Sequence, residues 1–206
     1  TQYFGWCNPN VKNPPLNKCN GKLIGLYSYA NSGNDPEDLE GHGSHTASTA
    51  GGNRVGAVNF NAPTIQVPMT ISGVAPHAMI IAYDACTPDG CNNDDLVAAL
   101  NQAATDGVDA LNYSISGSGL SPWVAEDEQA FLALREAGAF VSASAGNSGP
   151  DAQTVAHGSP WVTTTAASTH DRALINAAVN LTSSNGPLPD IYGRSVTTSL
   201  GPTPIV

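Results

Sequence analysis

The chain has 206 residues, with 7 Lys and Arg against 17 Asp and Glu, a formal net charge of −10 and a pI of about 4.6. Nucleic acids and anionic membranes attract basic surfaces, so we expect neither as a partner. Hydrophobic residues make up 41%, yet no apolar run approaches the roughly 18 residues that cross a bilayer. We expect no transmembrane helix, and Thr1–Cys7 lacks the basic and apolar regions of a signal peptide. The length fits one large domain, or one domain with part of a second.

The four cysteines lie in two close pairs along the chain. Cys7 and Cys19 bracket a loop rich in Asn, Pro and Lys, and Cys86 and Cys91 bracket Thr-Pro-Asp-Gly. Four cysteines allow three pairings, and proximity favours the two local disulfides. A metal site is the alternative, but neither spacing matches the paired C-x2-C of structural zinc. Disulfides persist in oxidising compartments, so we expect a secreted, extracellular protein.

Strand and helix patterns alternate along most of the chain. Apolar residues recur on one face of a predicted helix over 94–106, and Gly107 is placed to end it. Ser121-Pro122 is typical of a helix start, and that second helix is expected to end at Gly138. The predicted strands are residues 22–29, 78–85, 108–114, 139–145 and 161–167. This order predicts an α/β fold with a mostly parallel sheet and helices on both of its faces. After about residue 169 the helical period is lost, and the tail is expected to be β-rich.

Small polar residues and glycines gather where the predicted strands end. Ligands of parallel sheets bind beyond the carboxyl ends of the strands. One such segment is Ser114-Ile115-Ser116-Gly117-Ser118-Gly119, and another is Gly146-Asn147-Ser148-Gly149-Pro150. We therefore expect a binding site formed by these two segments.

The segment Glu40-Gly41-His42-Gly43-Ser44-His45 has two competing interpretations. In one, His42 stands at a helix N-terminus with His45 about one turn on. In the other, Glu40, His42 and His45 bind a metal ion and the chain is a metallohydrolase. The zinc motif H-E-x-x-H has its histidines at i and i+4 with an intervening Glu, and neither is present, so the metal interpretation is disfavoured. The remaining histidines, His77, His157 and His170, are expected to be structural.

Two motifs and the order of elements between them resemble the subtilisin-like serine proteases, the subtilases. The motifs are His42-Gly43-Ser44-His45-Thr46-Ala47, with Ser44 where the family usually has Thr, and Ser144-Ala145-Gly146-Asn147-Ser148-Gly149-Pro150. The resemblance runs from about Thr1 to Thr169. It implies that His42 is the catalytic base, that His45 is a structural neighbour, and that Asn147 supplies the oxyanion-hole side chain. A fixed amide donor suits this last role, because negative charge develops on the attacked carbonyl.

The resemblance also implies where a polypeptide substrate binds. Leu111–Gly117 is similar to the family's strand that pairs with the bound peptide, so Ser114, Ile115 and Ser116 are implied to form one wall of the specificity pocket. Ser144, Ala145 and Gly146 are implied to form the opposite wall. The small and apolar side chains suggest a roomy, neutral pocket.

More narrowly, the chain resembles secreted subtilases with an inserted protease-associated domain. The cysteine-bearing start, the strand Lys22-Leu23-Ile24-Gly25 and the change of character after Thr169 carry this likeness. It implies that residues 1–169 are part of a catalytic domain and that residues 170–206 begin the insert or a linker. Calcium is common in the family, but no acidic cluster here is dense enough to assign a site, so no cofactor or metal is expected.

Two members of the catalytic triad are missing. A subtilase triad runs Asp, His, Ser in chain order, but no Asp-Thr/Ser-Gly segment precedes His42 and no Gly-Thr-Ser-Met-Ala segment occurs. We expect an internal fragment of a serine endopeptidase that is inactive alone. A noncatalytic α/β module that binds peptides is the alternative. Strand edges left open by missing elements favour self-association of the fragment.

Overall fold

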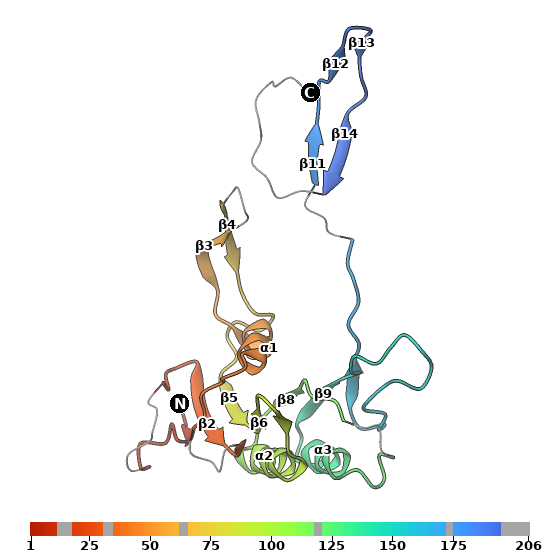
Figure 1. Ribbon diagram of the computed structural model, residues 1–206. Helices are drawn as coiled ribbons and strands as arrows, with labels where there is room; N and C mark the ends of the chain where they lie inside the picture. Colours follow the sequence, from red (N-terminus) through yellow and green to blue (C-terminus); the bar gives the residue numbers. More distant parts are fainter. Residues whose placement is uncertain (12–17, 31–34, 62–65, 118–120, 172–174, 195–206) are drawn as a thin grey trace. The chain divides into compact units, whose positions relative to one another are not determined.

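The computed structural model describes residues 1–11, 18–30, 35–61, 66–117, 121–171 and 175–194. The chain divides into two compact units. The first unit combines Thr1–Asn53 with Ser72–Ala167 and holds the helices and the parallel strands (Figure 1). The second combines Arg54–Ile71 with Ser168–Val206.

The first parallel sheet has three strands in the order β1-β2-β5: β1 (Phe4–Gly5), β2 (Leu23–Ser28) and β5 (Ile80–Asp84). β2 is the central strand and is buried at Ile24 and Leu26. The strand predicted over 22–29 is therefore confirmed. The strand predicted over 78–85 is shorter and only half-buried, because β5 lies at the edge of the sheet.

The second parallel sheet also has three strands, in the order β10-β9-β8. They are β8 (Ala110–Tyr113), β9 (Phe140–Ser144) and β10 (Thr163–Thr165), each shorter than predicted. No backbone ladder among the described residues joins β5 to β8, so the predicted parallel sheet is present as two sheets. The α/β fold class with parallel strands, predicted from the sequence, is confirmed.

Two helices connect and cover the strands, α2 (Asn93–Asp106) and α3 (Glu126–Glu136). α2 ends at Gly107, whose φ of 69° is the left-handed conformation that favours glycine. α3 begins later than predicted. The segment from Ser121 to Ala125 forms a turn in which Val124 and Ala125 donate backbone hydrogen bonds to the Ser121 carbonyl. The helix itself starts at Glu126, with three acidic residues in its first turn.

The core lies between these helices and the second sheet. Phe131 and Leu134 of α3 and Ala103 of α2 are 0% exposed, and Val141 of β9 is 1% exposed. Figure 1 shows α2 and α3 side by side on the same side of the strands. Burial of these side chains provides the main stabilisation of the unit.

A tyrosine pair links the first sheet to α2. The rings of Tyr27 and Tyr83 stack with centroids 5.2 Å apart, and their hydroxyls donate to the two carboxylate oxygens of Asp106 at 2.9 and 2.8 Å. Burial, together with the hydrogen bond to Asp106, raises the pKa of both tyrosines. The phenols therefore remain protonated donors across the physiological range.

Both local disulfides are present, Cys7–Cys19 and Cys86–Cys91. The second closes a short hairpin of β6 (Cys86–Thr87) and β7 (Gly90–Cys91). The favoured cysteine pairing is thus confirmed, and the described residues contain no free cysteine.

The second unit consists of antiparallel strand pairs. β3 (Val55–Asn61) pairs with β4 (Gln66–Ile71), a hairpin that the sequence analysis did not predict. β11 (Ile175–Ala178) pairs with β14 (Ile191–Arg194), and β12 (Thr182–Ser183) with β13 (Gly186–Pro187). The prediction of a β-rich tail is confirmed. Across the described part of the chain, no helix is long and apolar enough to cross a membrane.

Candidate active site

His42 is the first residue of helix α1 (His42–Gly51). The preceding Gly41 has a φ of 92° and no side chain with which to cap the helix. Asp38 supplies the cap instead, since its carboxylate accepts hydrogen bonds from the backbone N–H groups of Gly41 and Ser44, both at 2.7 Å. The Glu40 carboxylate accepts from the His42 N–H at 3.0 Å. Two acidic side chains therefore accept from three backbone N–H groups at this helix end, those of Gly41, His42 and Ser44.

Asp38 is adapted to this capping role. Burial would raise the pKa of its carboxyl, but hydrogen bonds from Gly41, Ser44 and Glu40 outweigh burial and lower the pKa. Asp38 therefore holds the start of α1 as a charged carboxylate. Asp38 lies only four residues before His42 in the chain, and this closeness allows its side chain to cap the helix.

The side chains of His42 and His45 are exposed. Within the described residues, neither imidazole has a hydrogen-bond partner. Nor does that part of the chain contain a group of three His, Cys, Asp or Glu side chains placed to hold a metal ion. The metallohydrolase alternative therefore has no structural support.

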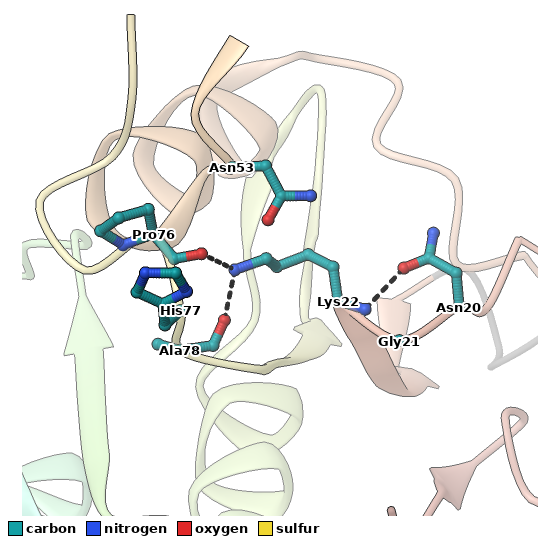
Figure 2. Close-up of a pocket in the computed structure, with 7 residues that line it drawn as sticks. All are labelled: Asn20, Gly21, Lys22, Asn53, Pro76, His77 and Ala78. Atoms are coloured by element: carbon teal, nitrogen blue, oxygen red, sulfur yellow. Dashed lines mark hydrogen bonds between the residues drawn. The ribbon is translucent and has the colours of Figure 1, made fainter.

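Lys22 binds the opposite end of α1. Its ammonium donates to the carbonyl of Gly51, the last residue of the helix, at 2.8 Å, and to the carbonyls of Pro76 and Ala78, the first of these at 2.7 Å. Figure 2 shows the Lys22 side chain reaching toward Pro76 and Ala78. A cation is favourable at a helix C-terminus. Lys22 thus connects helix α1 to the segment that leads into β5.

A cavity of about 540 Å³ lies beside Lys22. None of the predicted site residues lines it; its lining residues are Asn20, Gly21, Lys22, Asn53, Pro76, His77 and Ala78. The three N–H groups of the Lys22 ammonium are already used by backbone carbonyls. The cavity therefore offers no unused lysine donor for an anion, and the candidate peptide site lies elsewhere.

The two predicted pocket walls meet at the carboxyl ends of β8 and β9. The Ser144 hydroxyl donates to the Ile115 carbonyl at 3.3 Å. Gly146 has a φ of 80°, and a Cβ added there would lie 3.3 Å from the Cβ atoms of Ser116 and Ala156. A larger residue would be strained and crowded at this point. The structure thus brings 115–116 and 144–146 together.

Asn147 lies just beyond this junction. Its side chain is exposed, in the turn that follows β9. The chain on either side is held by backbone bonds, from Ala145 N–H to the Thr165 carbonyl at 2.9 Å and from Ala156 N–H to the Ala145 carbonyl at 3.1 Å. No hydrogen bond among the described residues joins His42 to Asn147 or to either wall.

A buried polar network behind the wall was missed by sequence reasoning. Glu128, His157 and Ser159 are 3%, 2% and 5% exposed. His157 Nδ1 lies 3.0 Å from Glu128 Oε1, its Nε2 lies 2.9 Å from the Ile115 carbonyl oxygen, and the Ser159 hydroxyl donates to Glu128 Oε2. The expectation that His157 is structural is consistent with this burial. The sequence indicates only that Glu128 is an acidic residue in the first turn of a helix, and an acidic residue at that position is ordinarily exposed.

Comparison with known proteins identifies the family. The Peptidase S8 model of the subtilase family matches residues 12–196. The chain belongs to the subtilase family. Two curated relatives are Subtilisin-like protease SBT1.4 of Arabidopsis thaliana, 39% identical over 80% of this chain, and Subtilisin-like protease SBT4.12 of the same plant, 41% identical over 78%.

This subtilase chain is short beside those relatives. It spans 23% of Subtilisin-like protease SBT1.4 and 21% of Subtilisin-like protease SBT4.12. Among solved structures, Sphericase is similar over 68% of this chain and 44% of its own, with 25% identity and a TM-score of 0.49. The family match and the curated relatives confirm the resemblance to subtilases inferred from two short motifs.

Proposed function

We propose that this chain is a segment of a secreted subtilisin-like serine endopeptidase that hydrolyses peptide bonds. Membership of the subtilase family supports the reaction class. The two disulfides support an oxidising compartment. The substrate class is a polypeptide, bound along the end of β8.

His42 is assigned as the general base and Asn147 as an oxyanion donor. His42 is exposed at the start of a helix whose two ends are held by Asp38 and Lys22. In the mechanism, the imidazole takes the proton of the serine nucleophile and later gives it to the leaving amine. The Asn147 amide N–H would stabilise the negative charge that develops on the attacked carbonyl oxygen.

The observation that carries the proposal is the meeting of the two walls. Ile115 and Ser116 on one side and Ser144 and Gly146 on the other come from segments about thirty residues apart, yet they contact one another. Parallel strands present their carboxyl ends at the same edge, which is where ligands bind in such sheets. The small, uncharged side chains at this edge support an uncharged substrate side chain as the one bound here.

These 206 residues are proposed to be inactive alone. The sequence holds neither the Asp segment nor the Ser segment of the triad, and it spans about a quarter of the curated relatives. The full-length protein is proposed to supply both residues, with residues 170–206 leading into an inserted domain.

The assignment of His42 can be tested in the full-length protein with a matched pair of exposed histidines. His42→Ala is expected to lower kcat on casein by about 10⁶-fold, the size of effect known for the type enzyme of the family. His45→Ala, on the same helix, is expected to retain most activity. Equal losses in both variants would overturn the assignment.

The 206-residue chain itself separates the two candidate functions. We expect no casein hydrolysis above background, and no labelling by a serine-directed fluorophosphonate. The contact between Ile115 and Ser144 favours peptide binding as the second candidate, since it forms without the nucleophile. Hydrolysis that fluorophosphonate abolishes would contradict the proposed inactivity. Peptide binding by a full-length protein without turnover would favour the noncatalytic module.

A further inference from the structure

The buried network of Glu128, His157 and Ser159 ends on the wall of the proposed peptide site. His157 is the link, with one ring nitrogen directed at Glu128 and the other at the Ile115 carbonyl. Its ring packs edge-on against Tyr113 and Phe131, with centroids 5.5 and 5.6 Å away. The imidazole is therefore fixed by contacts on all these sides.

The hydrogen on Nε2 follows from the chemistry of its partner. The Ile115 carbonyl oxygen can only accept, and it lies 2.9 Å from Nε2. Nε2 must therefore carry a hydrogen. The Ile115 oxygen accepts a second bond from the Ser144 hydroxyl at 3.3 Å. Of its two donors, His157 is the nearer and the more buried.

A second hydrogen must lie between His157 and Glu128. Nδ1 and Oε1 are 3.0 Å apart, and without a hydrogen two lone pairs would face each other in a buried site. Either an imidazolium faces a carboxylate, or a neutral imidazole accepts from a carboxylic acid. Both arrangements hold the same number of protons and have no net charge. Both also leave Glu128 Oε2 free to accept from the Ser159 hydroxyl.

We propose that Glu128 and His157 are positioning residues that form a buried pair with one shared proton. The Nε2–H of His157 fixes the Ile115 carbonyl, and with it the wall of the proposed specificity pocket that contains Ile115. The role of Ile115 in a peptide site rests on the proposed function, whereas the proton arrangement of Glu128 and His157 does not. Further contacts fix the pair itself, because Trp161 Nε1 donates to the Glu128 carbonyl at 2.7 Å and Thr164 Oγ1 to the His157 carbonyl at 2.6 Å.

The test is nitrogen NMR of the 206-residue chain with two substitutions of Glu128. The amide nitrogen of Ser116 is bonded to the Ile115 carbonyl carbon, so its chemical shift reports hydrogen bonding to that carbonyl. In Glu128→Gln the new amide donates to Nδ1 and preserves the Nε2–H tautomer. The Ser116 signal is expected to stay in place in this variant. In Glu128→Leu the ring loses its anchor, and the signal is expected to move.

Wild-type spectra alone can overturn the proposal. The His157 Nε2 signal must be that of a protonated nitrogen, and a bare Nε2 would disprove the arrangement whether or not either variant folds. Ser116 shifts of equal size in Glu128→Gln and Glu128→Leu would show that Glu128 acts only by filling space. The exposed His42 serves as the reference histidine, and its signals should be the same in both variants.

Peptide binding separates this proposal from the proposed function. For an N-acetylated tetrapeptide amide of Ala, Pro and Leu, which carries no charge, Glu128→Leu is expected to weaken binding about tenfold, or 1.4 kcal/mol, and Glu128→Gln to leave it unchanged. If the chain binds no peptide while the Ser116 shift still responds to the Glu128 variants as expected, the proposed peptide site of this chain fails and the proton arrangement stands. If peptide binds equally to all three forms, the positioning role fails.

Discussion

His42 and His157 lie in the same compact unit in opposite environments. His42 is exposed at the start of α1, and its imidazole has no hydrogen-bond partner among the described residues. His157 is 2% exposed and both of its ring nitrogens are engaged. A triad histidine must be reachable by the substrate, and its two ring nitrogens contact the Asp and the Ser of the triad. The buried ring of His157 instead has both nitrogens directed at Glu128 and the Ile115 carbonyl. Asp38 and Lys22 bind backbone groups at the two ends of α1, which leaves the His42 ring available to the Asp and the Ser that the full-length protein is proposed to supply.

The strongest challenge to this comparison is to truncate each histidine in turn. His157→Ala leaves the Glu128 carboxyl buried without its partner, and is expected to lower the free energy of unfolding by about 3–5 kcal/mol. His42→Ala should change it by less than about 0.5 kcal/mol, because no described contact is lost. Urea unfolding measures both values. A costly His42→Ala would mean that His42, too, is structural.

The next test concerns the end of the His42 helix that Lys22 binds. Lys22→Met removes a cation from three backbone carbonyls and is expected to cost about 2 kcal/mol. Lys18→Met is the matched control, since the Lys18 ammonium makes only an exposed ion pair with Glu37 at 2.7 Å and should cost about 0–1 kcal/mol. Thermal melts of the two variants should differ clearly. Equal melting temperatures would show that the carbonyls around Lys22 are satisfied by water.

On the His157 side, the packing of the two walls can be tested at Gly146. Gly146→Ala forces a side chain into a left-handed backbone conformation and against Ser116, at an expected cost of about 1–2 kcal/mol. Gly117→Ala, where an added Cβ meets nothing within 4 Å, should be nearly neutral. Urea unfolding of the pair measures the difference. A neutral Gly146→Ala would contradict the contact between the walls.

The smallest expected effect is at the start of the His42 helix. Asp38→Asn weakens the cap and should cost about 0.5–1 kcal/mol at neutral pH. Because the pKa of Asp38 is lowered in the folded state, its stabilising effect is present above its ordinary value of 3.8 and is lost as pH falls through the lower folded pKa. Stability measured from pH 7 to pH 3 should show wild type and variant converging. Asp151→Asn, at an exposed site, should show no such convergence.

Secondary structure was predictable where a pattern was local. The helix over 94–106 has its apolar face and Gly107 within one stretch of sequence, and α2 follows that prediction closely. Ser121-Pro122 predicts the next helix with Ser121 as its N-cap, four residues before the observed N-cap Ala125, because a Ser-Pro pair also forms the isolated turn found there. The β3–β4 hairpin was missed because its strands, interrupted by Gly56 and Pro68, show no clean alternation.

The sequence by itself determined the α/β class, the subtilase motifs and the local disulfides, because each depends on residues close together in the chain. Only the tertiary structure decided that Ile115 meets Ser144, that Lys22 binds both Gly51 and Pro76, and that Glu128 pairs with His157. These contacts join residues 29 to 54 positions apart, and folding alone sets which of them meet. The motif identified His42, and burial distinguished it from His157.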